Sequence, residues 1–422
     1  MRKKVCFLLV TISILMLAGC GKEKIIYEDT YIQGQDFPYQ YSGCTYEFGV
    51  STVETEDGYY KLMNKFLYYI DKKTMKTTPL CGKTDCLHDK EKGKHLEECN
   101  AFVNSEDGYI YQYGDYMYFL SLEYNKTENA YENNLYRISM DASNREKVCK
   151  LKEKKISLWM IHRGYVYYVT DKDKHNALMR FSLDDSTHKA ETVTVLKNVY
   201  NADPSELIAY GNYVYFYTLG FNKDIKNDLS DNWTKTMANC WVCYNIKTGE
   251  VKELFPEQVR NGETVKIVQN IRFFKDKIIT EYSYMDKKNE DGKSVYQFDL
   301  NGENKKKILE LEDAMDCICA DENYLYVYNS WRDSVADGKE KPQMLVYDKD
   351  LKKIDNMEMP ISAYTHLSPG NKDCFLMGQE GEDTSAIVYI KKDKIGTYHG
   401  KKMEAAACYE TQNNTDDTET AE

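Results

Sequence analysis

A short turn followed by an alternating aromatic strand recurs along this chain, and the repeat limits the folds that the sequence can adopt. Gly164 precedes Tyr165-Val166-Tyr167-Tyr168, and Gly211-Asn212 precedes Tyr213-Val214-Tyr215-Phe216. Gly, Asn and Asp supply the positive φ angles that tight hairpin turns need. The aromatic strands begin at residues 59, 116, 165, 213, 277, 324 and 374, with steps of 57, 49, 48, 64, 47 and 50.

A second strand follows each aromatic strand and ends on a polar turn, and further strands flank several of these pairs. The second strands are predicted at 66–71, 135–139, 178–182, 241–245, 295–299, 344–348 and 386–390. Four strands in units of about 40–50 residues are typical of β-propeller blades. The sequence therefore predicts an all-β propeller of seven four-stranded blades. The alternative is one or two β-sandwiches, whose strands have no fixed four-strand period.

Tyrosine is the unusual component of this composition, with 37 copies against 7 prolines. Tyrosine favours half-buried strands, in which the ring packs inside and the hydroxyl reaches water. The repeat resembles a propeller family of unknown function related in shape to the low-density-lipoprotein-receptor propeller, through Tyr68-Tyr69-Ile70-Asp71 and Tyr167-Tyr168-Val169-Thr170-Asp171. It also resembles TolB-type propellers. The resemblance covers about 45–398 and implies a fold rather than an activity.

The N-terminus has the pattern of an export signal. Three cations in Met1-Arg2-Lys3-Lys4 precede an apolar run from Val5 to Leu17, which is shorter than the roughly 20 residues of a spanning helix. Leu17-Ala18-Gly19-Cys20 resembles the bacterial lipobox. That resemblance implies cleavage before Cys20 and a lipid on its thiol, and two acyl chains anchor a protein stably. The alternatives are an ordinary signal peptide or an N-terminal membrane helix.

These features divide the chain into four parts. We expect a signal peptide at 1–19, a lipidated Cys20 and tether at 20–43, the propeller at 44–409 and a disordered acidic tail at 410–422. The expected location is the outer face of the bacterial cytoplasmic membrane. The set of lipobox, cysteine-rich insertion and aromatic blades resembles lipoproteins of Gram-positive anaerobes.

The charge and the motifs limit the possible functions. A net charge of −12 argues against nucleic acid as a partner, since phosphate binding needs a basic face. The chain has no Gly-x-Ser-x-Gly elbow, His-Glu-x-x-His helix, Walker loop or dinucleotide fingerprint, so no catalytic residue is assigned. The histidines outside the cysteine-rich insertion are scattered singly in the sequence: His162, His175, His188, His366 and His399.

A cysteine-rich insertion at 81–99 separates the first two blades. Cys81, Cys86, His88 and Cys99 provide three thiols and an imidazole, a ligand set that Zn²⁺ binds tetrahedrally in structural sites. His95 could replace His88. A disulfide among the cysteines, which export permits, and unpaired thiols are the alternatives. The expected cofactor is thus at most a structural zinc.

Two other groups of residues suggest sites more weakly. The loop with Asp224, Asp228, Asp231 and Trp233 could bind calcium or a sugar, or could be a solvated loop. Cys240 and Cys243 lie in one expected strand, where alternation directs them to opposite faces, so we expect no metal or redox pair there.

Two functions remain open from the sequence. The favoured hypothesis is a membrane-anchored binding or scaffold protein whose ligand is a protein, peptide or glycan. The alternative is a surface hydrolase or lyase with its active site in the propeller channel.

Overall fold

The structure is a computed structural model of the 422-residue chain. It describes residues 25–32, 35–36, 52–63, 65–88, 98–104, 109–222, 237–255, 265–285, 294–311, 317–329, 341–359, 366–368, 373–380 and 384–412. Cys20, the signal peptide, His95 and the Asp224–Trp233 loop lie outside these ranges. Within them, no helix is long and apolar enough to cross a membrane.

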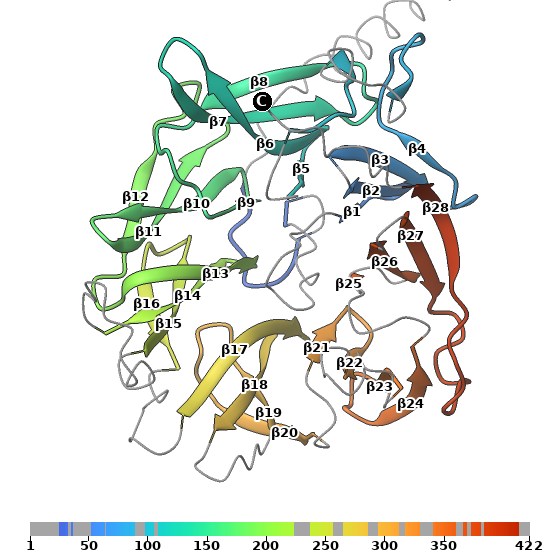
Figure 1. The fold of residues 1–422 in the computed structure, drawn as a ribbon. Helices are drawn as coiled ribbons and strands as arrows, with labels where there is room; N and C mark the ends of the chain where they lie inside the picture. The colour runs from blue at the N-terminus through green and yellow to red at the C-terminus, as the bar shows by residue number, and fades with distance from the viewer. Residues whose placement is uncertain are drawn as a thin grey trace, which may run out of the picture.

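Seven four-stranded antiparallel sheets form a ring of blades, with the first strand of each blade nearest the centre (Figure 1). Blade 1 consists of β1 (Thr52–Glu54), β2 (Gly58–Met63), β3 (Phe66–Asp71) and β4 (Thr77–Pro79). Blade 2 consists of β5 (Tyr111–Tyr113), β6 (Tyr116–Asn125), β7 (Ala130–Ser139) and β8 (Arg145–Lys150). Blade 3 consists of β9 (Leu158–His162), β10 (Tyr165–Lys172), β11 (His175–Ser182) and β12 (Glu191–Val195).

The other four blades have the same order of strands. Blade 4 consists of β13 (Tyr200–Tyr210), β14 (Tyr213–Phe221), β15 (Met237–Asn245) and β16 (Val251–Leu254). Blade 5 consists of β17 (Val265–Phe274), β18 (Lys277–Met285), β19 (Ser294–Phe298) and β20 (Lys306–Glu310). Blade 6 consists of β21 (Cys317–Ala320), β22 (Leu325–Tyr328), β23 (Gln343–Tyr347) and β24 (Lys353–Glu358). Blade 7 consists of β25 (His366–Ser368), β26 (Cys374–Glu380), β27 (Thr384–Lys391) and β28 (Ala406–Gln412).

The prediction of seven four-stranded blades is confirmed. The aromatic strands begin within one residue of the predicted positions, and each predicted second strand falls on the third strand of a blade. Gly114, Gly164 and Gly211 have the positive φ angles expected of the turns before the aromatic strands. Residues 410–412, which were expected in the acidic tail, complete β28.

Tyrosines connect neighbouring blades in a way that composition did not predict. Many aromatic-strand rings are fully buried rather than half-buried, because each blade packs against two others. Their hydroxyls therefore need partners inside the protein. Tyr60 donates to Met140 O of blade 2, Tyr111 to Trp159 O of blade 3 and Tyr215 to Leu300 O of blade 5, at 3.1, 2.8 and 2.7 Å.

The ring closes through side chains between blades 7 and 1. Each blade is built from consecutive strands, so the first and last blades share no strand among the described residues. The Tyr68 ring on β3 contacts the Tyr409 ring on β28, with centroids 4.5 Å apart, and the two hydroxyls share a hydrogen bond of 2.8 Å. The Cys374 thiol lies 3.6 Å from the Tyr59 hydroxyl across the same boundary. Buried residues of both blades form one apolar cluster there.

The N-terminal residues 25–32 and 35–36 lie inside the ring of innermost strands (Figure 1). They contact the turn between β9 and β10 and the turn between β13 and β14, at Arg163, Gly211 and Asn212. This described part of the segment that we predicted as a tether is therefore held by the propeller. We call the end of the ring formed by the β9–β10 and β13–β14 turns the inner-turn face.

Tyr409→Phe should lower the free energy of unfolding by about 1 kcal/mol, because it removes the hydrogen bond with Tyr68 and keeps the ring. The matched control is Tyr131→Phe, whose side chain is exposed on blade 2, and its effect should stay within about 0.5 kcal/mol. Chemical denaturation followed by circular dichroism measures both. Equal effects of the two substitutions would contradict the role of Tyr409 in closing the ring.

Candidate metal centre

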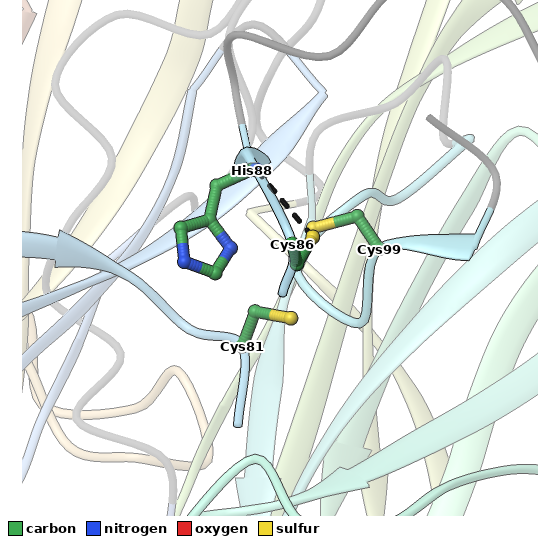
Figure 2. A group of neighbouring side chains, drawn as sticks. All are labelled: Cys81, Cys86, His88 and Cys99. Carbon is green, nitrogen blue, oxygen red and sulfur yellow. Dashed lines mark hydrogen bonds between the residues drawn. The ribbon is translucent and has the colours of Figure 1, made fainter. Parts of the chain in front are cut away.

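The structure brings together the four residues that the sequence singled out. Cys81, Cys86 and His88 follow β4, and Cys99 lies where the chain returns to blade 1 (Figure 2). One ligand atom from each residue lies within 4.8 Å of the other three. Figure 2 shows the three sulfur atoms grouped together with the His88 ring at their side.

Both arms of the insertion are fixed by the edge of β3. Leu80 N donates to Leu67 O at 2.7 Å, and Leu67 N donates to Ala101 O at 2.8 Å. Val103 N continues this pairing by donating to Lys65 O at 2.7 Å. The outgoing and returning segments thus leave the same strand edge side by side, which places Cys81 near Cys99 although 17 residues separate them.

Blade 2 supports the returning arm. Asn100 Nδ2 donates to Ala142 O at 2.9 Å, in the turn between β7 and β8. The Arg145 guanidinium donates to the carbonyls of Cys99 and Phe102. The same guanidinium lies 5.1 Å from the centre of the Phe119 ring, where a cation–π contact adds to the hydrogen bonds.

Backbone N–H groups near the sulfur atoms oppose the effect of burial on the thiol pKa values. His88 N–H donates to Cys86 Sγ at 3.4 Å. The N–H groups of Lys83 and Asn100 lower the pKa of Cys81, and the N–H group of Ala101 acts in the same direction on the pKa of Cys99. Donors aimed at sulfur favour the thiolate form, which is the form that binds metals. The backbone therefore provides a partial positive environment for three negative ligands.

The three thiols differ in acidity. Burial raises the pKa of Cys81, but the backbone and thiol hydrogen bonds outweigh it and lower the pKa below the usual value. Burial raises the pKa of Cys86 above the usual value. Burial and the Cys86 thiol raise the pKa of Cys99 to about 12. Without a cation, the site thus favours one thiolate and opposes the second and third.

His88 has an unused nitrogen in this environment. Its Nδ1 is buried and has no hydrogen-bond partner among the described residues. A buried polar atom without a partner costs about 1–3 kcal/mol. Coordination of a cation by Nδ1 would remove this cost.

The other predicted site residues do not join this group. Cys240 and Cys243 lie in two different apolar clusters on opposite sides of blade 4, as strand alternation predicted. His162 is buried and donates through Nε2 to Gly211 O at 2.8 Å, whereas His399 is exposed.

Arg163 is the residue that sequence reasoning missed. Its side chain is fully buried and its guanidinium binds the Asp36 carboxylate through two nitrogens, at 2.6 and 2.9 Å. The only sequence signal was an arginine before Gly164, in the turn that leads into the aromatic strand. Nothing in the sequence linked it to an aspartate 127 residues away.

Comparisons with known proteins concern the fold. No protein-family model and no curated protein matches this chain. Among solved structures, it resembles the β-propeller domain of the Trilobed protease from Pyrococcus furiosus, with 12% identity, a TM-score of 0.43, and coverage of 74% of this chain and 98% of that one. It also resembles TolB from Acinetobacter baumannii, with 12% identity, a TM-score of 0.36, and coverage of 85% and 81%.

A third similar structure is the acylaminoacyl peptidase of Pyrococcus horikoshii, with 13% identity and a TM-score of 0.42. The match covers 72% of this chain and 52% of the peptidase. The chain thus spans about half the length of that enzyme.

Proposed function

We propose that this chain is a lipid-anchored extracellular binding or scaffold protein, built on a propeller that a structural zinc stabilises. The observation that carries the zinc proposal is the grouping of four ligand atoms within 4.8 Å of one another. A tetrahedral zinc with Zn–S bonds of about 2.3 Å needs sulfurs about 3.8 Å apart. Small side-chain movements would bring the site to that geometry.

The ligand set favours a structural role over a catalytic one. Cys81, Cys86, His88 and Cys99 would fill all four positions of a tetrahedral zinc, so no position is left for a water or substrate. A zinc cation would also make three thiolates stable together, which the raised pKa values of Cys86 and Cys99 otherwise oppose.

The position of the centre suggests what the zinc would stabilise. Cys99 and Ala101 belong to the apolar cluster that also contains Tyr68 and Ile387, at the boundary between blades 1 and 7. Because no strand is shared across that boundary among the described residues, closure depends on side-chain packing. A zinc that fixes Cys81, Cys86 and Cys99 beside β3 would hold one side of this boundary rigid.

A disulfide is the competing interpretation of the same cysteines. Cys81, Cys86 and Cys99 are all free thiols in the structure. A disulfide would use two of them, leave the third thiol unpaired and give no role to His88. The unpartnered Nδ1 of His88 therefore supports a metal.

Protein purified without chelators should contain about one equivalent of zinc, measured by elemental mass spectrometry. Cys86→Ser and His88→Ala should each lose it, because a Cys3His site needs all four ligands. Cys149→Ser is the matched control, since this thiol belongs to blade 2 and lies outside the centre.

A disulfide would give the opposite pattern. The intact mass would be about two units below that of the reduced chain, with no metal bound, and His88→Ala would leave that mass difference unchanged. Circular dichroism of each variant separates loss of metal from loss of fold.

The anchor proposal rests on the N-terminal sequence. A labelled fatty acid fed to expressing bacteria should appear on the wild-type chain, and Cys20→Ser should abolish the label, because the thiol is the acceptor in the lipobox resemblance. Substitution of Cys6, inside the predicted signal peptide, is the control and should leave the label in place. A labelled, membrane-bound Cys20→Ser chain would refute the anchor.

Three buried ion pairs, each between different blades or between a blade and the N-terminal segment, support a binding function rather than catalysis. Glu206 of blade 4 pairs with Arg272 of blade 5 at 2.8 Å, and both are buried. Asp321 of blade 6 pairs with Lys392 of blade 7, and Asp36 pairs with Arg163. These carboxylates are neutralised by cations within the protein, whereas general acids and bases must exchange protons with a substrate.

The purified propeller should retain a protein, peptide or glycan from cell-surface extracts and show no turnover of glycosides, esters or peptides. Glu54, at the end of β1, is the residue to test for the enzyme alternative. Burial raises its pKa, although the ion pair with Lys72 at 2.6 Å opposes the rise. Hydrolysis or elimination that Glu54→Gln abolishes, with folding intact, would favour the hydrolase or lyase alternative.

A further inference from the structure

The guanidinium of Arg163 holds the N-terminal residues 25–32 and 35–36 at the inner-turn face. Arg163 has five N–H donors, and all five are engaged. Four of these bonds reach the segment: two to the Asp36 carboxylate and one each to Glu28 O and Thr30 O. The fifth goes to Asn212 Oδ1, which links the turns of blades 3 and 4.

A second set of contacts fixes the same segment to blade 4. Asn212 Nδ2 donates to the Asp29 carboxylate at 2.7 Å. Asp29 O lies 2.3 Å from the position that a Cβ on Gly211 would occupy, so this close approach requires a glycine. The Ile32 amide in turn donates to Asp36 Oδ2 at 2.9 Å, which holds the segment in a compact turn.

The distance from this segment to the lipid anchor is short. Ile25, the first described residue, follows Cys20 by five positions. Five residues of extended chain span at most about 18 Å. If Cys20 carries the lipid, as proposed above, Ile25 stays within that distance of the lipidated residue. Ile25 Cδ1 lies 3.7 Å from the position of a Cβ on Gly164, so the β9–β10 turn of the inner-turn face lies close to this point of attachment.

We propose that residues 25–32 and 35–36 orient the propeller on the membrane, with the inner-turn face toward the lipid surface and the opposite end of the ring outward. The partner of the inner-turn face is thus a lipid surface. The outward end, which carries the β6–β7 and β10–β11 turns, is the end available to a ligand. This inference rests on the proposed lipidation of Cys20.

Blade 3 provides two probe sites, one near the inner-turn face and one near the outward end of the ring. Ser182, at the end of β11, pairs with Tyr165, and Leu183 N donates to Gly164 O at 2.9 Å, so Ser186 lies near the inner-turn face. Asp173 precedes the start of the same strand, and both probe residues are exposed. The eight residues of β11 separate the two ends by about 26 Å.

The test measures energy transfer from each probe site to the membrane. A fluorescent non-canonical amino acid replaces Ser186 or Asp173 in the full lipidated chain, because the native free cysteines prevent selective thiol labelling. Each protein is reconstituted into phosphatidylcholine vesicles that contain an acceptor on the lipid headgroup. Transfer from position 186 should exceed transfer from position 173 by about twofold or more, given their separation along β11.

Two variants test whether the docked segment causes the difference. A Gly/Ser insertion of about twenty residues after Lys22 adds a mean reach of about 25 Å and should bring the ratio toward one. The same insertion at the C-terminus is its control. The double substitution Asp29→Ala and Asp36→Ala should also lower the ratio, whereas Glu28→Ala should not, because Glu28 contributes only its backbone carbonyl.

The outcomes separate the two proposals. A chain that does not float with the vesicles overturns both the anchor and the orientation. A chain that floats with equal transfer from both positions overturns the orientation alone. A ratio that survives the insertion after Lys22 also overturns the orienting role of residues 25–32 and 35–36.

Discussion

Tyrosine hydroxyls that donate to the backbone of the neighbouring blade are the interaction on which the ring depends. Each sheet is stable only between two others, so its aromatic rings are buried on both sides and their hydroxyls leave water. A buried hydroxyl without a partner costs about 1–3 kcal/mol. Tyr60, Tyr111 and Tyr215 avoid this cost by donating to a carbonyl of the next blade. The same residue type therefore supplies apolar area and fixes the spacing between blades.

The sequence predicted the parts of this structure that repeat or lie close together in the chain. The strand positions followed from the spacing of the aromatic strands, because every blade packs between two neighbouring blades in the same way. The centre of Cys81, Cys86, His88 and Cys99 could be foreseen because its members lie within 19 residues and share a known ligand chemistry. The insertion leaves and rejoins the same edge of β3, which explains why residues close in the sequence are also close in space.

The contacts that the sequence did not reveal join residues far apart in the chain. Arg163 and Asp36, Arg272 and Glu206, and Tyr68 and Tyr409 pair across different blades or across the ring. Neither partner of such a pair carries a local signal, since a single arginine or aspartate in a turn is usually solvated. The polar composition of residues 21–43 thus indicated a tether, although Asp29 and Asp36 bind inside the ring.

The closing boundary has a consequence for biosynthesis. Synthesis from the N-terminus delivers blade 1 first and Tyr409 late, because Tyr409 lies 341 positions after Tyr68. Each new blade can pack on its predecessor as the chain emerges, but the outer flank of blade 1 must wait for β28. The entropy of closing so long a loop grows only slowly with its length. The time for which that flank stays uncovered is therefore set mainly by the speed of synthesis, and during that time the flank is the surface that most needs protection from aggregation.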